Sequence, residues 1–411
     1  MQDLGSRIRQ LRKERKLTLA QLAGERLTKG MLSLIENGKA QPSMESLHYI
    51  AQQLQVDVSA LLGEEIESLK ELMLEVEEMR VQLNDHPDDK VRAQIIIDKI
   101  NPIVDKLQTD RYEHIRLKEI YLISLTLINN KLDEHALYDV MNWYEGVHAY
   151  GRLLSCYNFL CWYAFERKDY EKALDMLKQG EKRIEPYWFI LDDISRISLF
   201  YNLTVMYYAV NDVKNGLLYK EKMLQIAEKK KIYYRMDDFY RLLFIQAICD
   251  HEFEVSKQYF KKVQLITELA EDNEKAFYYL FCKVHYISVV EKNYEQVLII
   301  LNEEIYSQRD ASSQETKDLF LMEEAIALYH LEKYEQALAI CEGIKAPNYL
   351  KHPVDLAIFY RFVAYRALMY KQLGDIESAK RDILYAEKSV ESFASTYYTD
   401  FIRQTYKEIM T

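Results

Sequence analysis

Apolar residues recur at every third or fourth position along most of the chain, which is the spacing of one buried face of an α-helix. Over residues 3–62 these runs are short and are separated by capping residues, so they predict five short helices. Beyond residue 63 the runs lengthen, while glycine and proline become scarce. This pattern predicts long helices joined by short turns, and the expected fold is therefore all-α.

The third short helix has the pattern of a helix that enters a DNA major groove. Thr28 is a favourable N-cap, and Gly38 suits the left-handed position that ends a helix. Leu32 and Ile35 are expected to be buried, which leaves the other side chains facing outward. The expected DNA-binding residues are Thr28, Lys29, Gly30, Met31, Ser33, Leu34, Asn37 and Lys39. We expect Lys29 and Leu34 to contact bases, and Asn37 and Lys39 to contact phosphates.

Four short motifs in this region resemble the Cro/phage-repressor type of helix-turn-helix domain. They lie at residues 8–12, 17–23, 33–39 and 42–47. The resemblance implies that Arg12 pairs with Glu36 and ties the first helix to the recognition helix. Where that family often has a phosphate-binding glutamine, this chain has Leu19, whose side chain has no polar group for that contact. An alternative is that the helix-turn-helix serves only as a protein-docking module.

A single amphipathic stretch follows at residues 64–83. Its apolar positions are Ile66, Leu69, Met73, Val76 and Leu83, with Arg80 interrupting the seam. This spacing predicts a linker helix that packs on the next domain or on its own copy in a dimer. A polar turn at residues 84–89 follows it. The expected domains are residues 1–63 for DNA binding, 64–87 for the linker and 88–411 for peptide binding and oligomerisation.

From residue 90 onward the sequence repeats itself. An apolar anchor recurs at positions 170, 213, 253, 294, 334 and 376, in steps of 40 to 43 residues, with a small residue or valine three places later. This arrangement resembles the hairpins of tetratricopeptide (TPR) repeats. Weaker matches near Leu132 and Val91 extend the series to about eight hairpins. Such hairpins stack into a right-handed superhelix whose concave wall binds extended peptides or helices.

Two of the expected inner helices repeat the dipeptide Tyr-Asn, at Tyr157-Asn158 and Tyr201-Asn202. Asparagine is a poor helix former, so its presence at matched positions in apolar helices needs a reason. Its side-chain amide is able to clasp a peptide backbone, and we expect these four residues to hold an extended peptide of about five to eight residues. The alternative is that the asparagines bridge adjacent helices. Weaker candidates for binding a peptide carboxylate are Arg116, Lys118 and Arg152.

The charge distribution separates the two ends of the chain. The net charge is −11, but residues 1–62 contain nine Lys/Arg and six Asp/Glu, so the N-terminal part carries +3 and the remainder −14. The N-terminal part is therefore suited to approach phosphates, although a domain of this charge contacts too few of them to bind tightly alone. We accordingly expect two copies of the protein on two DNA half-sites.

Cysteine usage and hydropathy place the protein in the cytoplasm. Its five cysteines are dispersed through apolar stretches and predict buried, reduced thiols. The polar start and the lack of any apolar run near 18 residues predict a soluble, unprocessed chain without a membrane partner. We find no motif for nucleotide, metal or nucleophilic catalysis, so we expect no enzyme activity, metal or cofactor.

The combination of the two domains resembles the peptide-pheromone receptors of Gram-positive bacteria, the Rap/Rgg/NprR/PlcR/PrgX group. The resemblance covers the chain and is greatest to the neutral-protease regulator (NprR) branch. It implies a cytoplasmic homo-oligomer, a dimer or larger, whose binding to double-stranded DNA is controlled by a short imported signalling peptide. Asn158 and Asn202 match the peptide-backbone asparagines of that group in kind and repeat position.

The leading hypothesis is therefore a quorum-sensing transcription regulator with a peptide bound in the concave groove. The main rival is a TPR interaction module that binds and inhibits a sporulation response regulator, with DNA binding secondary. A more distant alternative is an enzyme built on a TPR scaffold.

Overall fold

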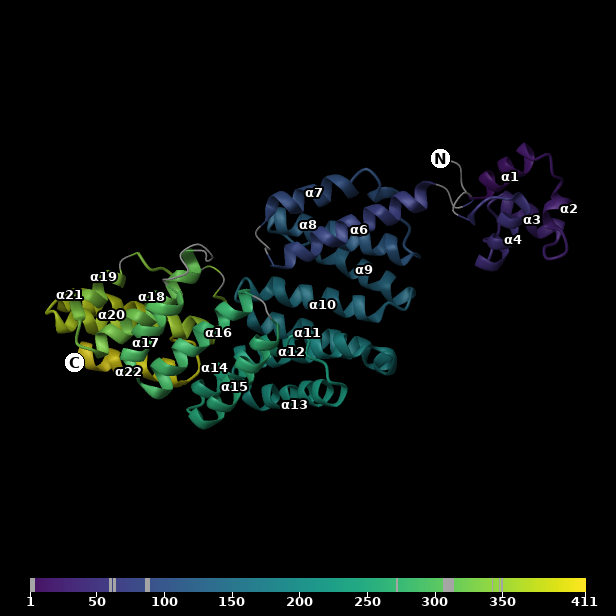
Figure 1. Ribbon diagram of the computed structural model, residues 1–411. Helices are drawn as coiled ribbons and strands as arrows, with labels where there is room; N and C mark the ends of the chain where they lie inside the picture. Colours follow the sequence, from purple (N-terminus) through teal and green to yellow (C-terminus); the bar gives the residue numbers. More distant parts are fainter. Residues whose placement is uncertain are drawn as a thin grey trace. The chain divides into compact units, whose positions relative to one another are not determined.

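The computed structural model describes residues 4–58, 61, 64–85, 89–270, 273–305, 314–341, 343–346, 348 and 350–411. Throughout these residues all regular secondary structure is helical, which confirms the predicted all-α class. The chain forms two compact units, Met1–Ala149 and Tyr150–Thr411, which are described separately (Figure 1).

The described part of the N-terminal bundle contains four short helices. They are α1 (Leu4–Glu14), α2 (Leu19–Ala23), α3 (Lys29–Glu36) and α4 (Met44–Leu54). Thr18, Thr28 and Ser43 accept hydrogen bonds from backbone amides as the N-caps of α2, α3 and α4, because each side-chain oxygen reaches a free amide of the first turn. The core includes the fully buried side chains of Ile8 and Leu22. Of the expected fifth helix, Leu61 is buried in this core, whereas residues 59, 60 and 62 lie outside the described part.

The expected linker helix is α6 (Glu64–Asp85), and it packs on its own chain. The other elements of this region are α7 (Lys90–Ile100), η1 (Val104–Lys106), α8 (Tyr112–Asn129) and α9 (Glu134–Gly146). Val76 and Leu83 are buried in a cluster with residues of α7 and α8, and Leu69 and Met73 pack against it. The side chain of Ile66 is outside the described part, as are residues 86–88 of the expected boundary. The predicted seam therefore covers the next two helices.

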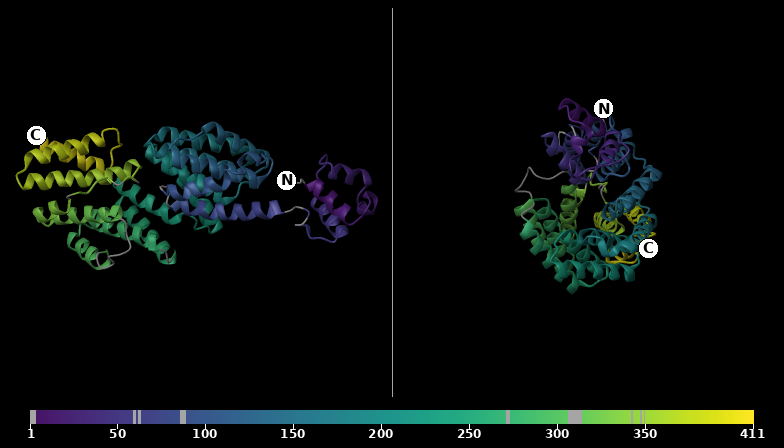
Figure 2. Two further views of the ribbon diagram at one scale, coloured as in Figure 1. Left: turned by 90° about the horizontal axis from the view of Figure 1, so that it is seen from above. Right: turned by 90° about the vertical axis from the view of Figure 1, so that its right-hand side faces the viewer.

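The second unit is an array of helical pairs. Its elements are α10 (Tyr150–Phe165), α11 (Tyr170–Ile184), η2 (Glu185–Ile190), α12 (Asp193–Ala209), α13 (Val213–Lys230), α14 (Met236–Cys249), α15 (Phe253–Ala270), α16 (Asn273–Tyr286), η3 (Ile287–Glu291), α17 (Tyr294–Ile300), η4 (Leu301–Ile305), α18 (Gln314–His330), α19 (Tyr334–Cys341), α20 (Pro353–Gln372), α21 (Ile376–Ser389) and α22 (Tyr397–Met410). Consecutive helices pack in pairs, as in α10 with α11 and α12 with α13. The pairs stack into the predicted superhelix, and its curvature is visible in Figure 2.

The six predicted repeat anchors are the first residues of α11, α13, α15, α17, α19 and α21. Two positions before each anchor lies a residue with positive φ, for example Lys168 (φ 60°) and Gly374 (φ 83°). Three positions after each anchor the small residue or valine is buried, as for Ala173 and Ala379 at 0% exposure. The repeated sequence motif is thus a left-handed turn residue, an anchor and a close-packing position, which confirms the predicted hairpins.

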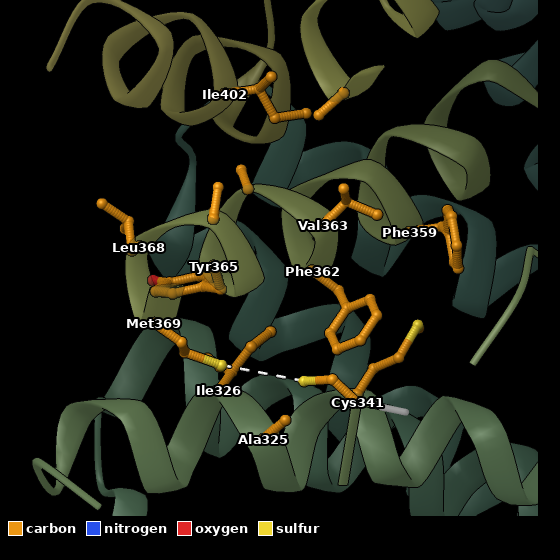
Figure 3. Close-up of a cluster of buried hydrophobic side chains, with 14 of the residues drawn as sticks. Ala325, Ile326, Cys341, Phe359, Phe362, Val363, Tyr365, Leu368, Met369 and Ile402 are labelled. Atoms are coloured by element: carbon orange, nitrogen blue, oxygen red, sulfur yellow. Dashed lines mark hydrogen bonds between the residues drawn. The ribbon is translucent and has the colours of Figure 1, made fainter. Parts of the chain in front are cut away.

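The last pairs enclose the C-terminal core of the array. Figure 3 shows Phe362 and Met369 of α20 meeting Ile326 of α18 and Cys341 of α19, with the sulfur atoms of Cys341 and Met369 3.8 Å apart. Ile402 of α22 joins the same cluster, so the final helix packs on α20 and α21. All five cysteines are buried and form no disulfide bonds, as the sequence predicted.

A polar network is buried beside this core. His285 Nδ1 lies 2.7 Å from Glu323 Oε1, and His285 Nε2 lies 2.7 Å from the hydroxyl of Tyr398. Arg361 donates to the same Glu323 oxygen at 3.4 Å. The network links α16, α18, α20 and α22 through side chains that are almost fully excluded from water.

None of the helices described in the structure is long and apolar enough to cross a membrane.

Candidate DNA-binding helix and peptide-binding cavity

Helix α3 begins and ends as its sequence predicted. The Thr28 side chain accepts a hydrogen bond from the Met31 amide at 3.1 Å. Gly38 has φ +68°, and the backbone amides of Gly38 and Lys39 donate to carbonyls of the last turn. Because the left-handed conformation suits glycine, α3 ends where the chain must turn toward α4.

One face of α3 is buried and the opposite face is open. Leu32 and Ile35 are in the core of the bundle, as predicted. Met31 and Leu34 are 45% and 44% exposed, and Lys29 and Lys39 are also exposed. An exposed apolar pair flanked by lysines has the chemistry for thymine methyl groups and phosphates.

The Arg12–Glu36 pair holds α3 against α1. Arg12 Nε and Nη2 donate to Glu36 Oε1 and Oε2 at 2.6 and 2.8 Å, and Arg12 Nη1 donates to the Leu17 carbonyl at 2.9 Å. The hydrogen bond to Glu36 raises the pKa of Arg12. The two helices also approach closely at Gly5 of α1, where an added Cβ would be 2.2 Å from the carbonyl oxygen of Ile35 in α3. The pairing implied by the family resemblance is therefore present.

Asn37 is placed differently from the expectation. Its Nδ2 donates to the Ser33 carbonyl at 2.7 Å, so the amide closes the last turn of α3. The geometry therefore assigns Asn37 a capping role in the helix and does not support its role as a phosphate contact. Ser33 is half-buried beside it, while Gly30 is exposed in the first turn.

A cavity of about 600 Å³ lies on the inner side of the second unit. Residues of α10, α12, α14, α16, α18 and α20 line it, together with the segment that precedes α20. Aromatic side chains dominate several parts of the wall, including Trp162, Phe165, Tyr201, Tyr278 and Phe281. The first helices of the hairpins thus line a partly open, largely apolar space with a few polar groups, which is the usual character of a ligand site.

Asn158 and Asn202 both line the cavity, but they also bond to each other. Asn202 Nδ2 donates to Asn158 Oδ1 at 3.0 Å. The pair therefore bridges α10 and α12, as the alternative expected, and it also faces the cavity, so its role in peptide binding stays a prediction. The expectation that the two amides grip peptide groups about three residues apart is wrong, because the amides are in direct contact and form one polar site.

The two neighbouring tyrosines have different surroundings. Tyr201 lines the cavity, with the guanidinium of Arg235 3.7 Å from its ring centre. Tyr157 is buried against α11, where an added Cβ on Gly180 would be 2.9 Å from the Tyr157 ring. Tyr157 is therefore a packing residue between paired helices, and its expected role in peptide binding is not supported.

The three basic candidates from the sequence have different surroundings. Arg116 is buried on α8 and donates to Glu77 at 2.5 and 2.7 Å and to Glu119 at 2.8 Å. Its guanidinium therefore neutralises internal carboxylates and is not available to a peptide. Lys118 Nζ lies 4.9 Å from the ring centre of Trp143. Arg152 is half-buried on α10 and does not line the cavity.

The sequence reasoning missed Arg235, Arg241 and Asp355, all of which line the cavity. Arg235 directly precedes α14, with φ 57° and no capping hydrogen bond from its side chain. An arginine in the N-cap position, where Ser, Thr, Asp or Asn is preferred, was a signal that the sequence offered. Asp355 occupies the first turn of α20, an ordinary position for an acidic residue, and it gave no such signal.

The segment before α20 crosses to the first helices of this unit. Tyr170 donates to the Lys351 carbonyl at 2.6 Å, and His352 Nε2 donates to the Val205 carbonyl at 3.2 Å. His352 Nδ1 accepts from the Val354 amide, so the ring is the neutral tautomer, and burial lowers its pKa. Leu350 and His352 line the cavity. This bridging segment, residues 350–352, therefore forms part of the cavity wall.

Comparisons with known proteins match the N-terminal bundle to a family. Residues 8–61 match the helix-turn-helix family, so this part is a helix-turn-helix domain. Over 63 residues the chain is 44% identical to the immunity repressor protein of Bacillus phage phi105, a match covering 15% of this chain and 44% of the repressor. The chain therefore spans less than half the length of that relative.

Solved structures show lower similarity. PlcR of Bacillus thuringiensis, in complex with the peptide PapR7 and DNA, is 18% identical with a TM-score of 0.37, covering 71% of this chain and 99% of PlcR. The apo form of the competence regulator ComR from Streptococcus vestibularis is 18% identical with a TM-score of 0.36, covering 70% of this chain and 98% of ComR.

Proposed function

We propose that this protein is a transcription regulator whose binding to DNA is controlled by a short peptide held in the cavity of the repeat array. The observation that carries the proposal is that one chain combines an exposed α3 face in a helix-turn-helix domain with a partly open, largely apolar cavity containing a paired amide site. The peptide is an imported quorum-sensing signal, and the DNA site contains two half-sites for a dimer. Asn158 and Asn202 hold the peptide backbone from one point of the wall.

The direct test of peptide binding uses a soluble mixture of random synthetic heptapeptides and the full-length protein. Leu242 is half-buried on the cavity wall, so Leu242→Trp places an indole in the space. Mass spectrometry of the retained peptides is expected to show that the wild type keeps a subset that Leu242→Trp loses. Equal retention by both proteins would place the binding site elsewhere.

Lys29→Ala is expected to weaken the preference of the protein for particular bases at one base step of the operator. Lys29 is the first residue of α3 and is exposed, in the position from which a recognition helix reaches base edges. The expected loss is about 1 to 3 kcal/mol of binding to the preferred site. A selection from random DNA duplexes measures the preference. The control Lys168→Ala alters an exposed lysine of the repeat array and should leave the selected site unchanged.

Tyr170→Phe is expected to loosen the bridging segment. Burial raises the pKa of Tyr170 to about 12, so the phenol stays protonated and donates to the Lys351 carbonyl. Loss of this bond should cost about 1 kcal/mol and raise the population of open segment several-fold. Initial rates of tryptic cleavage after Lys351 measure the effect. Tyr163→Phe on the same hairpin is the control, and equal rates in Tyr170→Phe and wild type would contradict the bridging role.

A further inference from the structure

Four charged side chains line the cavity, and two of them neutralise each other. Arg241 and Asp238 form an ion pair one helical turn apart on α14. The other two are Arg235 and Asp355. They lie at the beginnings of α14 and α20 and do not pair with each other. Within the part of the chain that the structure describes, no carboxylate forms an ion pair with Arg235 and no basic group forms one with Asp355.

Arg235 is held in position although it lacks a counter-ion. Its guanidinium stacks over Tyr201 at 3.7 Å from the ring centre, and Nη1 lies 3.5 Å from Asn202 Oδ1. Because Asn202 also donates to Asn158, a polar row runs from α10 through α12 to the start of α14 and ends in a cation. The positive φ of Arg235 adds a backbone conformation that is costly for a residue other than glycine.

Asp355 is the complementary group. The titratable groups that act on it are His352, the N-cap of the same helix, which is neutral and bonded at both ring nitrogens, and Arg241 of α14, which is paired with Asp238. Burial raises the pKa of Asp355, and the charge of nearby Arg241 opposes that rise only in part. Both side chains are half-buried, and a partly desolvated charge without an ion-pair partner is costly, so a ligand that brings the opposite charge recovers that cost.

We infer that the cavity recognises a dipolar peptide, with a carboxylate bound by Arg235 and a cationic group bound by Asp355. The part of the peptide between its two charged groups is apolar or aromatic. It lies along Trp162, Tyr278 and Phe281, and its backbone contacts the Asn158–Asn202 pair. This inference rests on the proposed function and adds to it the charge and direction of the ligand. A chain end and a side chain are equivalent sources of each charge, since the chemistry of the contact is the same.

Four mixtures of random heptapeptides test the inference: free at both ends, amidated at the C-terminus, acetylated at the N-terminus, and blocked at both ends. Each is passed over immobilised full-length protein, and retained peptides are sequenced by mass spectrometry. If chain ends are recognised, amidation and acetylation should each reduce retention about 10- to 100-fold. If side chains are recognised, the blocked mixture should yield peptides with Asp or Glu at one position and Lys or Arg at another.

The variants assign each preference to its residue. Arg235→Gln should abolish the preference for a carboxylate, Arg235→Lys should keep it, and Asp355→Asn should abolish the preference for a cation. Arg167→Gln is the matched control, because Arg167 stacks over Tyr163 at 3.5 Å outside the cavity. Glu377→Gln is the control for Asp355, since Glu377 occupies the first turn of α21.

The outcomes separate the two proposals. Retention that Leu242→Trp abolishes, with charge preferences that follow Arg235 and Asp355, supports both. Retention that Leu242→Trp abolishes, with no charge preference or with preferences unchanged in Arg235→Gln and Asp355→Asn, overturns the dipolar ligand and leaves the peptide cavity in place. No retention by the wild type from any mixture overturns both.

Discussion

Glu36→Ala is expected to unfold most of the N-terminal bundle while the repeat array stays folded. Glu36 and Arg12 have side chains only 4% and 12% exposed, and the pair joins α1 to α3 through two hydrogen bonds. Removing one partner of a buried pair costs about 3 to 5 kcal/mol, because the remaining charge loses its compensation. A small bundle has little more stability than this.

Hydrogen exchange of the full-length protein, followed by mass spectrometry, measures this effect. Peptides from α1–α4 should lose protection in Glu36→Ala, and peptides from α10–α15 should keep it. The control is Glu14→Ala, which removes an exposed carboxylate of α1 that accepts a hydrogen bond from Gln10 at 2.8 Å. Wild-type protection of α3 in Glu36→Ala would contradict the role of the pair.

Glu323→Ala is expected to destabilise the C-terminal half of the array by a similar amount, about 3 to 5 kcal/mol. It leaves the guanidinium of Arg361, only 2% exposed, without its carboxylate partner, and it removes a hydrogen-bond partner of His285. Urea unfolding of the full-length protein measures the loss. Glu335→Ala, which removes an exposed carboxylate on α19, is the control and should change stability by less than about 0.5 kcal/mol.

The same network predicts a pH dependence. Although burial opposes it, the charges of His285 and Arg361 lower the pKa of Glu323 to about 2, from an ordinary value of 4.5. A carboxyl whose pKa is depressed by folding stabilises the protein above its unfolded pKa and loses that contribution as the pH falls toward the folded value. The stability difference between wild type and Glu323→Gln should therefore be constant above pH 4.5 and shrink between pH 4.5 and about 2. A difference that does not change over this range would contradict the assignment.

The fold was predictable because its signals are local. Thr28 and Gly38 mark the ends of α3 within the sequence itself, and each hairpin turn repeats the same short pattern of left-handed residue and anchor. Buried positions such as Ala173 and Ala379 follow from helical spacing alone. Reasoning from capping, periodicity and turn chemistry therefore reached the class of fold and the six hairpins.

The binding site was less predictable because it depends on side-chain direction and on distant segments. The matched positions of Asn158 and Asn202 indicated the inner wall, but not that the two amides bond to each other. The sequence did not indicate that Arg116 pairs with Glu77 of a different helix and is therefore unavailable to a peptide carboxylate. Arg235 and Asp355 line the same cavity because the superhelix brings the starts of α14 and α20 to its wall.

The most direct test of the account is the affinity of the full-length protein for its operator, with and without a heptapeptide recovered from the free-ended mixture. Fluorescence anisotropy of a labelled duplex obtained by DNA selection gives both values. We predict that the peptide changes the operator affinity of the wild type at least about tenfold, since allosteric coupling is typically 1 to 3 kcal/mol. The operator affinity of Leu242→Trp should be the same with and without the peptide. Equal operator affinity with and without a peptide that demonstrably fills the cavity would contradict the account.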